Sequence, residues 1–289
     1  MKHAYLILAH HEFDILMRLV KALDDERNDI YIHFDKKADP IPEIVTAHSN
    51  VYILSNRIDV KWGDVSQIES ELLLFQEAVH GSYAYYHLLS GVDMPLKSQD
   101  YIHRFFALHS GKEFIGYCQK DECPEIDRRV KQYHLFPKHF RATKGVLDFI
   151  RTALRYLFLR IQYILGFRRN SSTVFKKGTN WVSVSQEFVV YLLQHKEEIL
   201  KNYQHTYCAD EIFLQTLCWY SPFRKKLFDA NDESHGCMRL VGWKNSQIKD
   251  WEEKDYDLLV SADALFARKF NCKHLKVVDR LLYKTLSNA

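Results

Sequence analysis

Two short stretches of the chain place charged side chains beside hydrophobic anchors. In "ADALFARKFN", residues 262–271, Arg268 and Lys269 stand together between two phenylalanines, with no acidic residue beside them. In "YCADEIFLQTL", residues 207–217, Asp210 and Glu211 precede an apolar run with helical spacing. Adjacent cations suit an anionic ligand, and a carboxylate can serve as a general base toward a hydroxyl.

The local pattern leaves the roles of the two carboxylates open. An acid in the first turn of a helix is an ordinary N-terminal preference, and Asp210 is predicted to be such a residue. Glu211 has two interpretations. It is either another helix cap or a carboxylate at the mouth of a cleft, placed to take a proton from a hydroxyl.

Further polar residues follow apolar runs that are typical of buried strands. His10 follows "AYLILA", Asp35 follows "DIYIHF", and Asp93 follows "AYYHLLSGV". Open α/β sheets bind ligands at the carboxyl ends of their strands, so these side chains are candidates for one site. Taken alone, Asp35 fits a surface charge cluster equally well, and Asp93 fits a turn.

Several common sites are missing from the sequence. It contains none of the glycine-rich phosphate loops and no G-x-S-x-G nucleophile turn. "HHEFD" could offer His10, His11 and Asp14 to a metal ion, but adjacent residues on a strand point to opposite faces. We therefore predict no metal site there.

The elements that position these residues alternate along the chain. The predicted strands are 4–10, 29–35, 50–55, 84–91, 113–117 and 179–185, and the predicted helices are 13–23, 66–80, 100–110, 186–203, 209–219 and 277–286. Apolar strands that alternate with helices indicate an α/β fold with a mostly parallel sheet, covered on both faces.

Residues 148–165 form a different kind of helix. Arg151, Arg155 and Gln162 share one side, and large apolar residues cover most of the rest. One interpretation, which we favour, is a helix buried in the protein. The other is an interfacial helix within 148–169 that touches anionic lipid.

Composition limits the class of protein and its compartment. The formal net charge of +3 is too small for a general nucleic-acid-binding surface, so no nucleic-acid partner is expected. The six cysteines (118, 123, 208, 218, 237 and 272) form no C-x-x-C pair, which indicates free thiols in a reducing compartment. Without a signal-like N-terminus or an apolar run of about 18 residues, we predict a cytoplasmic protein that can contact the inner face of the membrane peripherally.

Eight stretches, in this order, resemble the core-2/I-branching glycosyltransferase family, which includes the peptide O-xylosyltransferases. They are "ILAHH", "IHFDKK", "VKWGDVSQIESELLLFQEAV", "YYHLLSGVDMPLKS", "KGTNWVSVSQEFVVYLL", "CADEIFLQTL", "MRLVGW" and "LFARKF", and they cover nearly the whole chain. The chain is most similar to a soluble, bacterial-type member without the membrane anchor and stem of the animal enzymes.

The resemblance implies a GT-A-like nucleotide-binding sandwich merged with an acceptor-binding half. The expected organisation is a single domain, 1–289, with residues 1–120 binding the nucleotide-sugar and 121–289 binding the acceptor and carrying the catalysis. It also implies inverting transfer from a UDP-sugar to a hydroxyl of a glycan or lipid-linked glycan, as in polysaccharide biosynthesis. N-acetylglucosamine is the expected sugar, and xylose or another hexose is the alternative.

By motif position, the resemblance also implies roles for individual residues. Glu211 matches the family's general base, and His10 and Asp35, with Asp93, match the nucleotide side. Arg239 and Lys269, with Arg268 beside it, would bind the diphosphate in place of a divalent metal, so no cofactor is expected. Arg268 could instead face solvent, because neighbouring side chains diverge.

Two departures from the family pattern matter. Ala209 stands where the family often has proline before the acid pair. The acceptor side aligns poorly, so Trp181, Arg128, Arg129 and Lys131 are acceptor contacts or simply core and surface residues. A non-catalytic relative that binds nucleotide-sugar or glycan is the alternative from a different functional class.

Overall fold

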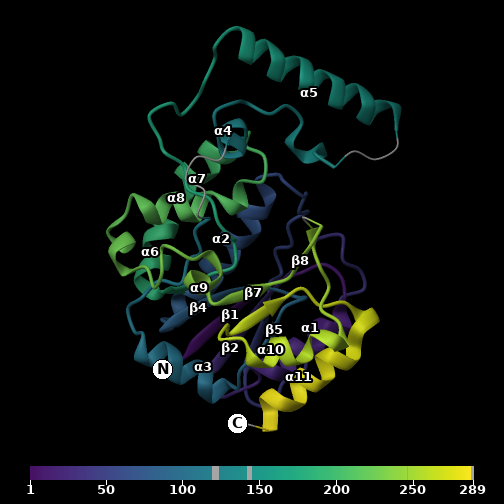
Figure 1. Ribbon diagram of the computed structural model, residues 1–289, viewed down its shortest axis with the longest axis vertical. Helices are drawn as coiled ribbons and strands as arrows, with labels where there is room; N and C mark the ends of the chain where they lie inside the picture. Colours follow the sequence, from purple (N-terminus) through teal and green to yellow (C-terminus); the bar gives the residue numbers. More distant parts are fainter. Residues whose placement is uncertain (119–123, 142–144, 246, 288–289) are drawn as a thin grey trace.

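The computed structural model describes residues 1–118, 124–141, 145–245 and 247–287 (Figure 1). Its centre is a five-stranded sheet of order β3-β2-β1-β4-β6. The strands are β1 (His3–Ala9), β2 (Asn28–Phe34), β3 (Asn50–Ile53), β4 (Tyr85–Ser90) and β6 (Ser183–Ser185). The first four run parallel and β6 pairs antiparallel to β4, which confirms the predicted α/β class with a mostly parallel central sheet.

Both faces of this sheet are covered by helices, because both faces of its central strands are apolar. Along β1, Ala4 and Leu6 belong to one hydrophobic core and Tyr5 and Ile7 to the other, as the two-residue period of a strand requires. The first core is closed by α2 (Ser66–Ala78), α6 (Gln186–Gln194) and α8 (Phe213–Trp219), and the second by α1 (Phe13–Leu23), α3 (Gln99–Leu108) and α11 (Leu275–Ser287).

The C-terminal segment returns to the N-terminal half. In a second, three-stranded sheet, β10 (Phe266–Arg268) lies between β5 (Met94–Pro95) and β7 (Arg239–Val241). Helix α11 packs against α1, where Arg18 Nε lies 2.6 Å from Asp279 Oδ1 (Figure 1). A division of the chain at residue 120 therefore does not divide the molecule in space, since the segment with Arg268 and Lys269 completes the half formed by the first 120 residues.

The remaining elements are short or peripheral. They are α4 (Pro124–Val130), α5 (Val146–Ile164), α7 (Lys196–Tyr203), α9 (Glu233–Cys237), α10 (Tyr256–Ser261), the pair β8 (Trp243–Lys244) and β9 (Gln247–Ile248), and 3-10 turns at Val79–Gly81, Pro137–His139, Ala209–Glu211, Pro222–Lys226, Glu253–Asp255 and Cys272–His274.

Two predicted elements differ from the structure. The helix expected over 186–203 is broken at His195, whose ring Nδ1 donates to the carbonyl of Tyr191 at 2.9 Å and whose backbone leaves helical geometry. The strand expected over 113–117 is reduced to isolated bridges, at Glu113 with Leu227 and at Phe114 with Ser183. The five cysteines that the structure describes are all free thiols.

Helix α5 is the largest departure from expectation. It stands away from the body of the molecule (Figure 1), and within it only Gln162 is buried. The favoured prediction of a buried helix is therefore wrong, because the polar side of α5 faces the protein and its apolar residues face outward. In the described part of the chain, no helix combines the length and hydrophobicity needed to cross a bilayer.

Candidate active site

The polar residues predicted at the strand ends lie at one edge of the sheet. The backbone N–H of Asp35 donates to the carbonyl of Ala9, and that of Gly91 donates to the carbonyl of Leu8, both at 2.9 Å. These bonds join the ends of β2 and β4 to the end of β1. They bring the residues after all three strands, among them His10 and Asp93, to the same carboxyl edge.

The two histidines share one side of this edge. β1 ends at Ala9, and the rings of His10 and His11 lie 4.0 Å apart between centroids. The expectation that they point to opposite faces is wrong, because the strand geometry has already ended. Partial desolvation, with the charge of His11 acting in the same direction, lowers the pKa of His10 and favours its neutral form. Among the described residues, no group of three or more His, Cys, Asp or Glu side chains is arranged to hold a metal ion.

Asp35 is buried at the end of β2, and its carboxylate is held by Lys37. The backbone N–H of Lys37 donates to Oδ1 and its ammonium donates to Oδ2, both at 2.9 Å. Lys37 also pairs with Asp59 at 2.8 Å. The position of Asp35 is therefore rigid, at the same edge as the histidines.

Arg268 points inward from the end of β10. Its Nε lies 3.6 Å from Asp93 Oδ1, its guanidinium lies 4.2 Å from the centroid of the Trp181 ring, and its side chain is 15% exposed. The alternative in which Arg268 faces solvent is therefore wrong. Burial raises the pKa of Asp93, and the charge of Arg268 opposes that rise. Trp181 packs against Arg268. This contact explains the position of Trp181 without a role in acceptor binding.

Lys269 lies on the outer side of the same turn. Its side chain is 40% exposed, and its Nζ lies 3.6 Å from Asp250 Oδ1. Burial lowers the pKa of His11, and the positive charge of Lys269 acts in the same direction. Lys269 therefore faces the histidine side of the edge, so the adjacent cations diverge, with Arg268 inside and Lys269 toward solvent.

Arg239 has a different environment from the one expected of a diphosphate ligand. Its guanidinium is completely buried, donating to the carbonyls of Cys237 and Val182 and to Ser183 Oγ, and it lies 4.4 Å from the Phe266 ring centroid. The bonds to Val182 and Ser183 join β7 to the start of β6, and the contact with the Phe266 ring joins β7 to β10. The burial of Arg239 argues against direct contact with a ligand and assigns it to holding the two sheets together.

Glu211 lies in the 3-10 turn before α8, and its side chain is 38% exposed. Its Oε2 accepts from Arg129 Nη1 at 2.9 Å and lies 3.4 Å from Lys177 Nζ. Arg129 also pairs with Glu125. The carboxylate is thus held in one orientation by two cations, and part of its surface remains accessible.

Asp210 is not the ordinary helix-start acid that the sequence predicted. It is buried, and its Oδ2 accepts from Gln67 Nε2 at 2.9 Å. Burial, with the neighbouring charge of Glu211, raises the pKa of Asp210 to about 7. Burial and the charge of Asp210 raise the pKa of Glu71 well above its ordinary value, and Glu71 accepts from Asn180 Nδ2 at 3.1 Å.

Buried charges connect the Arg268 end of the site to the Glu211 end. Burial lowers the pKa of Arg268, while Asp93 and Asp210 both act to raise it, so Asp210 is close enough for electrostatic interaction. Asp93 Oδ1, Asp210 Oδ1, Glu71 Oε2 and Arg268 Nε have no hydrogen-bond partner among the described residues. Leaving such an atom unpaired costs about 1–3 kcal/mol, so water or a ligand is the expected partner.

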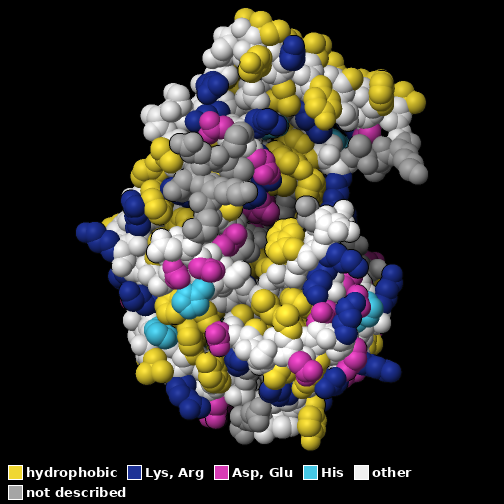
Figure 2. Space-filling view, in the orientation of Figure 1, with side chains coloured by type: hydrophobic (Ala, Val, Ile, Leu, Met, Phe, Trp, Pro, Cys, Tyr) yellow, Lys and Arg dark blue, Asp and Glu magenta, His cyan; other side chains and the backbone are white. Residues whose placement is uncertain are grey.

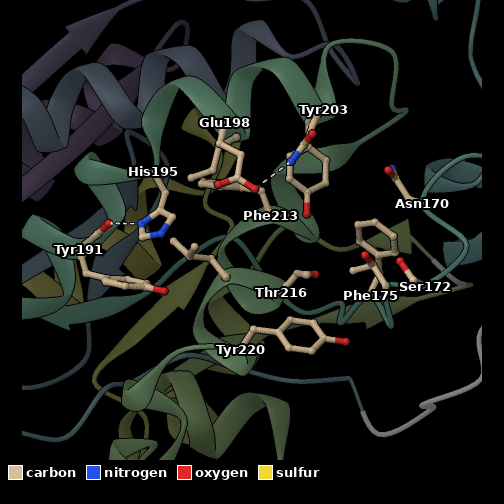
Figure 3. A pocket seen from close by; sticks show the side chains of 14 residues that line it. Asn170, Ser172, Phe175, Tyr191, His195, Glu198, Tyr203, Phe213, Thr216 and Tyr220 are labelled. Atoms are coloured by element: carbon tan, nitrogen blue, oxygen red, sulfur yellow. Dashed lines mark hydrogen bonds between the residues drawn. The ribbon is translucent and has the colours of Figure 1, made fainter.

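Two cavities of the described structure lie near the acceptor half, and neither is lined by Glu211, Arg268 or Lys269. One, of about 780 Å³, is lined by Arg128, Lys131 and Arg168 among others, and Lys131 pairs with Asp127 at 2.8 Å. The other, of about 400 Å³, lies among α6, α7, α8 and residues 170–175, and Figure 3 shows Tyr203, Tyr220 and Glu198 around it. The second cavity contains none of the predicted site residues. In Figure 2 the surface is hollowed between α5 and the body of the molecule.

The sequence reasoning missed the partners of the two carboxylates. The sequence predicts an acceptor contact or a core or surface position for Arg129, and it indicates no role for Lys177, Gln67, Glu71 and Asn180. All but Arg129 lie within the stretches that carry the family resemblance, "VKWGDVSQIESELLLFQEAV" and "KGTNWVSVSQEFVVYLL". Polar residues inside a matched motif, at i and i+4 on the same face of α2, were the available signal.

Comparisons with known proteins give the same family over nearly the whole chain. Similar proteins include xylosyltransferase 2 of Canis lupus familiaris, 23% identical over 97% of this chain and 33% of that protein. They also include an N-acetyllactosaminide beta-1,6-N-acetylglucosaminyl-transferase of Mus musculus, 22% identical over 96% of this chain and 73% of that protein. The chain spans about a third of the length of the xylosyltransferases it matches.

A human beta-1,3-galactosyl-O-glycosyl-glycoprotein beta-1,6-N-acetylglucosaminyltransferase is 24% identical over 74% of this chain and 47% of that protein. A crystal structure of mouse xyloside xylosyltransferase 1 in its apo form covers 94% of this chain and 99% of its own, with a TM-score of 0.39 and 10% identity. The family model described as Core-2/I-Branching enzyme matches residues 3–268. The chain therefore belongs to the core-2/I-branching enzyme family.

Proposed function

We propose that the chain is an inverting, metal-independent glycosyltransferase that moves a sugar from a UDP-sugar to a hydroxyl of a glycan acceptor. The observation that supports this most is Glu211, a partly exposed carboxylate that two cations hold beside a buried charged cluster. The acceptor is a glycan or a lipid-linked glycan.

In this proposal Glu211 is the general base. Inversion requires a single in-line displacement, so the base must lie opposite the departing UDP and within hydrogen-bond reach of the acceptor oxygen. Arg129 and Lys177 hold one carboxylate oxygen, Oε2, which leaves the other oxygen to take the proton. The two cations act as positioning residues for the Glu211 carboxylate.

Lys269 and Arg268 neutralise the leaving diphosphate. Negative charge grows on the diphosphate as the bond to the sugar breaks, and fixed cations in a poorly hydrated site stabilise that charge. Lys269 is accessible, whereas Arg268 is held by Asp93 and Trp181, so Lys269 makes the first contact with the donor. His10 and Asp35 bind the uridine end at the same edge, and Asp93 acts on the nucleotide through Arg268.

The donor sugar has two candidates within the proposal. The relatives include N-acetylglucosaminyltransferases and xylosyltransferases at similar identity, so UDP-N-acetylglucosamine and UDP-xylose are both to be tested. The alternative from another class, a non-catalytic relative that binds nucleotide-sugar or glycan, predicts binding without release of UDP.

The test is UDP release from a panel of UDP-sugars, with and without EDTA, in the presence of glycan acceptors. The proposal expects release with one donor, dependent on acceptor and unchanged by EDTA. A strict requirement for Mn²⁺ would overturn the cationic model of the leaving group. Binding of a UDP-sugar with no release under any condition would favour the non-catalytic alternative.

A further inference from the structure

Helix α5 attaches to the protein through its polar residues. The side-chain amide of Gln162 donates to the carbonyl of Tyr133 and accepts from the backbone N–H of the same residue, both at 2.9 Å. Arg155 donates to the carbonyl of His139 at 2.8 Å, and its guanidinium lies 4.7 Å from the Phe140 ring centroid. These contacts orient the helix and turn its polar side toward the body of the molecule.

The opposite side of α5 and the turn after it expose large hydrophobic side chains. These are Val146, Leu147, Phe149, Ile150, Leu154, Tyr156, Leu157, Ile161, Tyr163, Ile164, Leu165 and Phe167. Figure 2 shows hydrophobic side chains along the outer edge of this helix. A surface helix normally turns its apolar side to the core, so this inverted arrangement indicates that something else covers α5.

The charge of the surrounding segment identifies what covers it. Between residues 137 and 169 the only acidic residue is Asp148, whereas the basic residues include Lys138, Arg141, Arg151, Arg155, Arg160, Arg168 and Arg169. Arg160 and Arg168 are exposed, and no described residue forms a hydrogen bond or ion pair with either. A second copy of this segment would bring like charges together, whereas anionic phospholipid headgroups complement them.

We propose that α5 lies in the interface of an anionic phospholipid bilayer. Its outer leucines, isoleucines and aromatic rings enter the region between headgroups and acyl chains, and Arg160 and Arg168 reach the phosphates with their aliphatic stems in the apolar layer. With 19 residues, α5 is about 28 Å long, and the arginines along it keep it parallel to the surface. Bilayer binding rests on the exposed face of α5 and does not depend on the proposed transferase activity.

The test is co-sedimentation of the full chain with vesicles of phosphatidylcholine alone and of equal parts phosphatidylcholine and phosphatidylglycerol. One variant combines Leu147→Glu and Leu157→Glu on the exposed face of α5. The matched control combines Leu108→Glu on α3 and Leu286→Glu on α11, two leucines that are also exposed. Both variants change the net charge equally, so they separate the effect of the α5 face from that of overall charge.

The proposal expects the wild type and the control to bind the mixed vesicles and to bind phosphatidylcholine far more weakly. The α5 variant should bind the mixed vesicles at least about tenfold more weakly, because each buried leucine contributes more than that factor. No binding by the wild type would overturn the proposal, as would equal loss in both variants or no loss in the α5 variant. A dimer in solution that only the α5 variant disrupts would assign this face to a second copy instead.

Discussion

The base role of Glu211 makes the sharpest prediction, tested by Glu211→Gln. The substitution keeps the size and one oxygen of the side chain but removes its charge and its ability to accept a proton. A positioned general base contributes about 10²–10⁴-fold to rate, which corresponds to about 3–5 kcal/mol of barrier. We therefore expect UDP release in the presence of acceptor to fall by a factor in that range.

The structure predicts that the same substitution has little effect on stability. The Glu211 side chain is 38% exposed, so its ion pairs are screened by solvent and their loss costs about 0–1 kcal/mol. Arg129, which loses one partner, keeps its ion pair with Glu125. Urea unfolding should therefore give a midpoint close to that of the wild type, so any large loss of rate would be a loss of chemistry.

Glu125→Gln is the matched control, because it removes the other carboxylate that pairs with Arg129. Its turnover should stay within a few-fold of the wild type. Binding of the UDP-sugar, measured by calorimetry, should be retained in both variants. Wild-type turnover in Glu211→Gln would refute the base assignment, and equal losses in both variants would show that Arg129, and not the Glu211 carboxylate, carries the effect.

Three further predictions follow from the same site. Lys269→Ala should raise KM for the donor and lower kcat, so that kcat/KM falls about tenfold or more. Lys269→Arg should retain part of the donor affinity and part of the turnover. Unchanged steady-state kinetics in Lys269→Ala would remove Lys269 from the diphosphate site. Turnover in EDTA should equal turnover in added Mn²⁺, measured by UDP release. Folding raises the pKa of Asp210 from its ordinary 3.8 to about 7, so the folded state binds the proton more tightly and stability should fall as pH rises from about 4 to 7. Asp210→Asn should reduce the difference between the urea midpoints at pH 5 and pH 8. An equal difference in the wild type and in Asp210→Asn would contradict the burial of an ionisable Asp210.

Most of the fold was predictable because its signals are local and periodic. The helix expected over 13–23 has the same bounds as α1. The strands expected over 29–35 and 84–91 begin within one residue of β2 and β4. The break in the expected long helix at His195 was not predictable in the same way. It coincides with a hydrogen bond from the His195 ring to the Tyr191 carbonyl, and a hydrophobic pattern does not report such a bond. The predicted carboxyl edge also formed, since parallel strands necessarily end on the same side.

The candidate site was predictable in its members but not in their directions. Sequence position identified Arg239, Arg268 and Lys269 as a set of cations. The structure buries Arg239 completely and leaves the side chains of Arg268 and Lys269 15% and 40% exposed. The side chain of a residue in a turn points where the packing around the turn directs it. No local period reports that direction.

The sequence by itself determined the α/β alternation, the polar residues at the strand ends and the motifs that carry family membership, because each depends on residues near one another in the chain. Tertiary structure alone decided that Arg129 pairs with Glu211 across 82 positions, that Asp210 is buried, and that α5 turns its polar side inward. A helical pattern defines two faces but does not say which face the protein covers. That choice depends on the surface against which the finished fold places the helix.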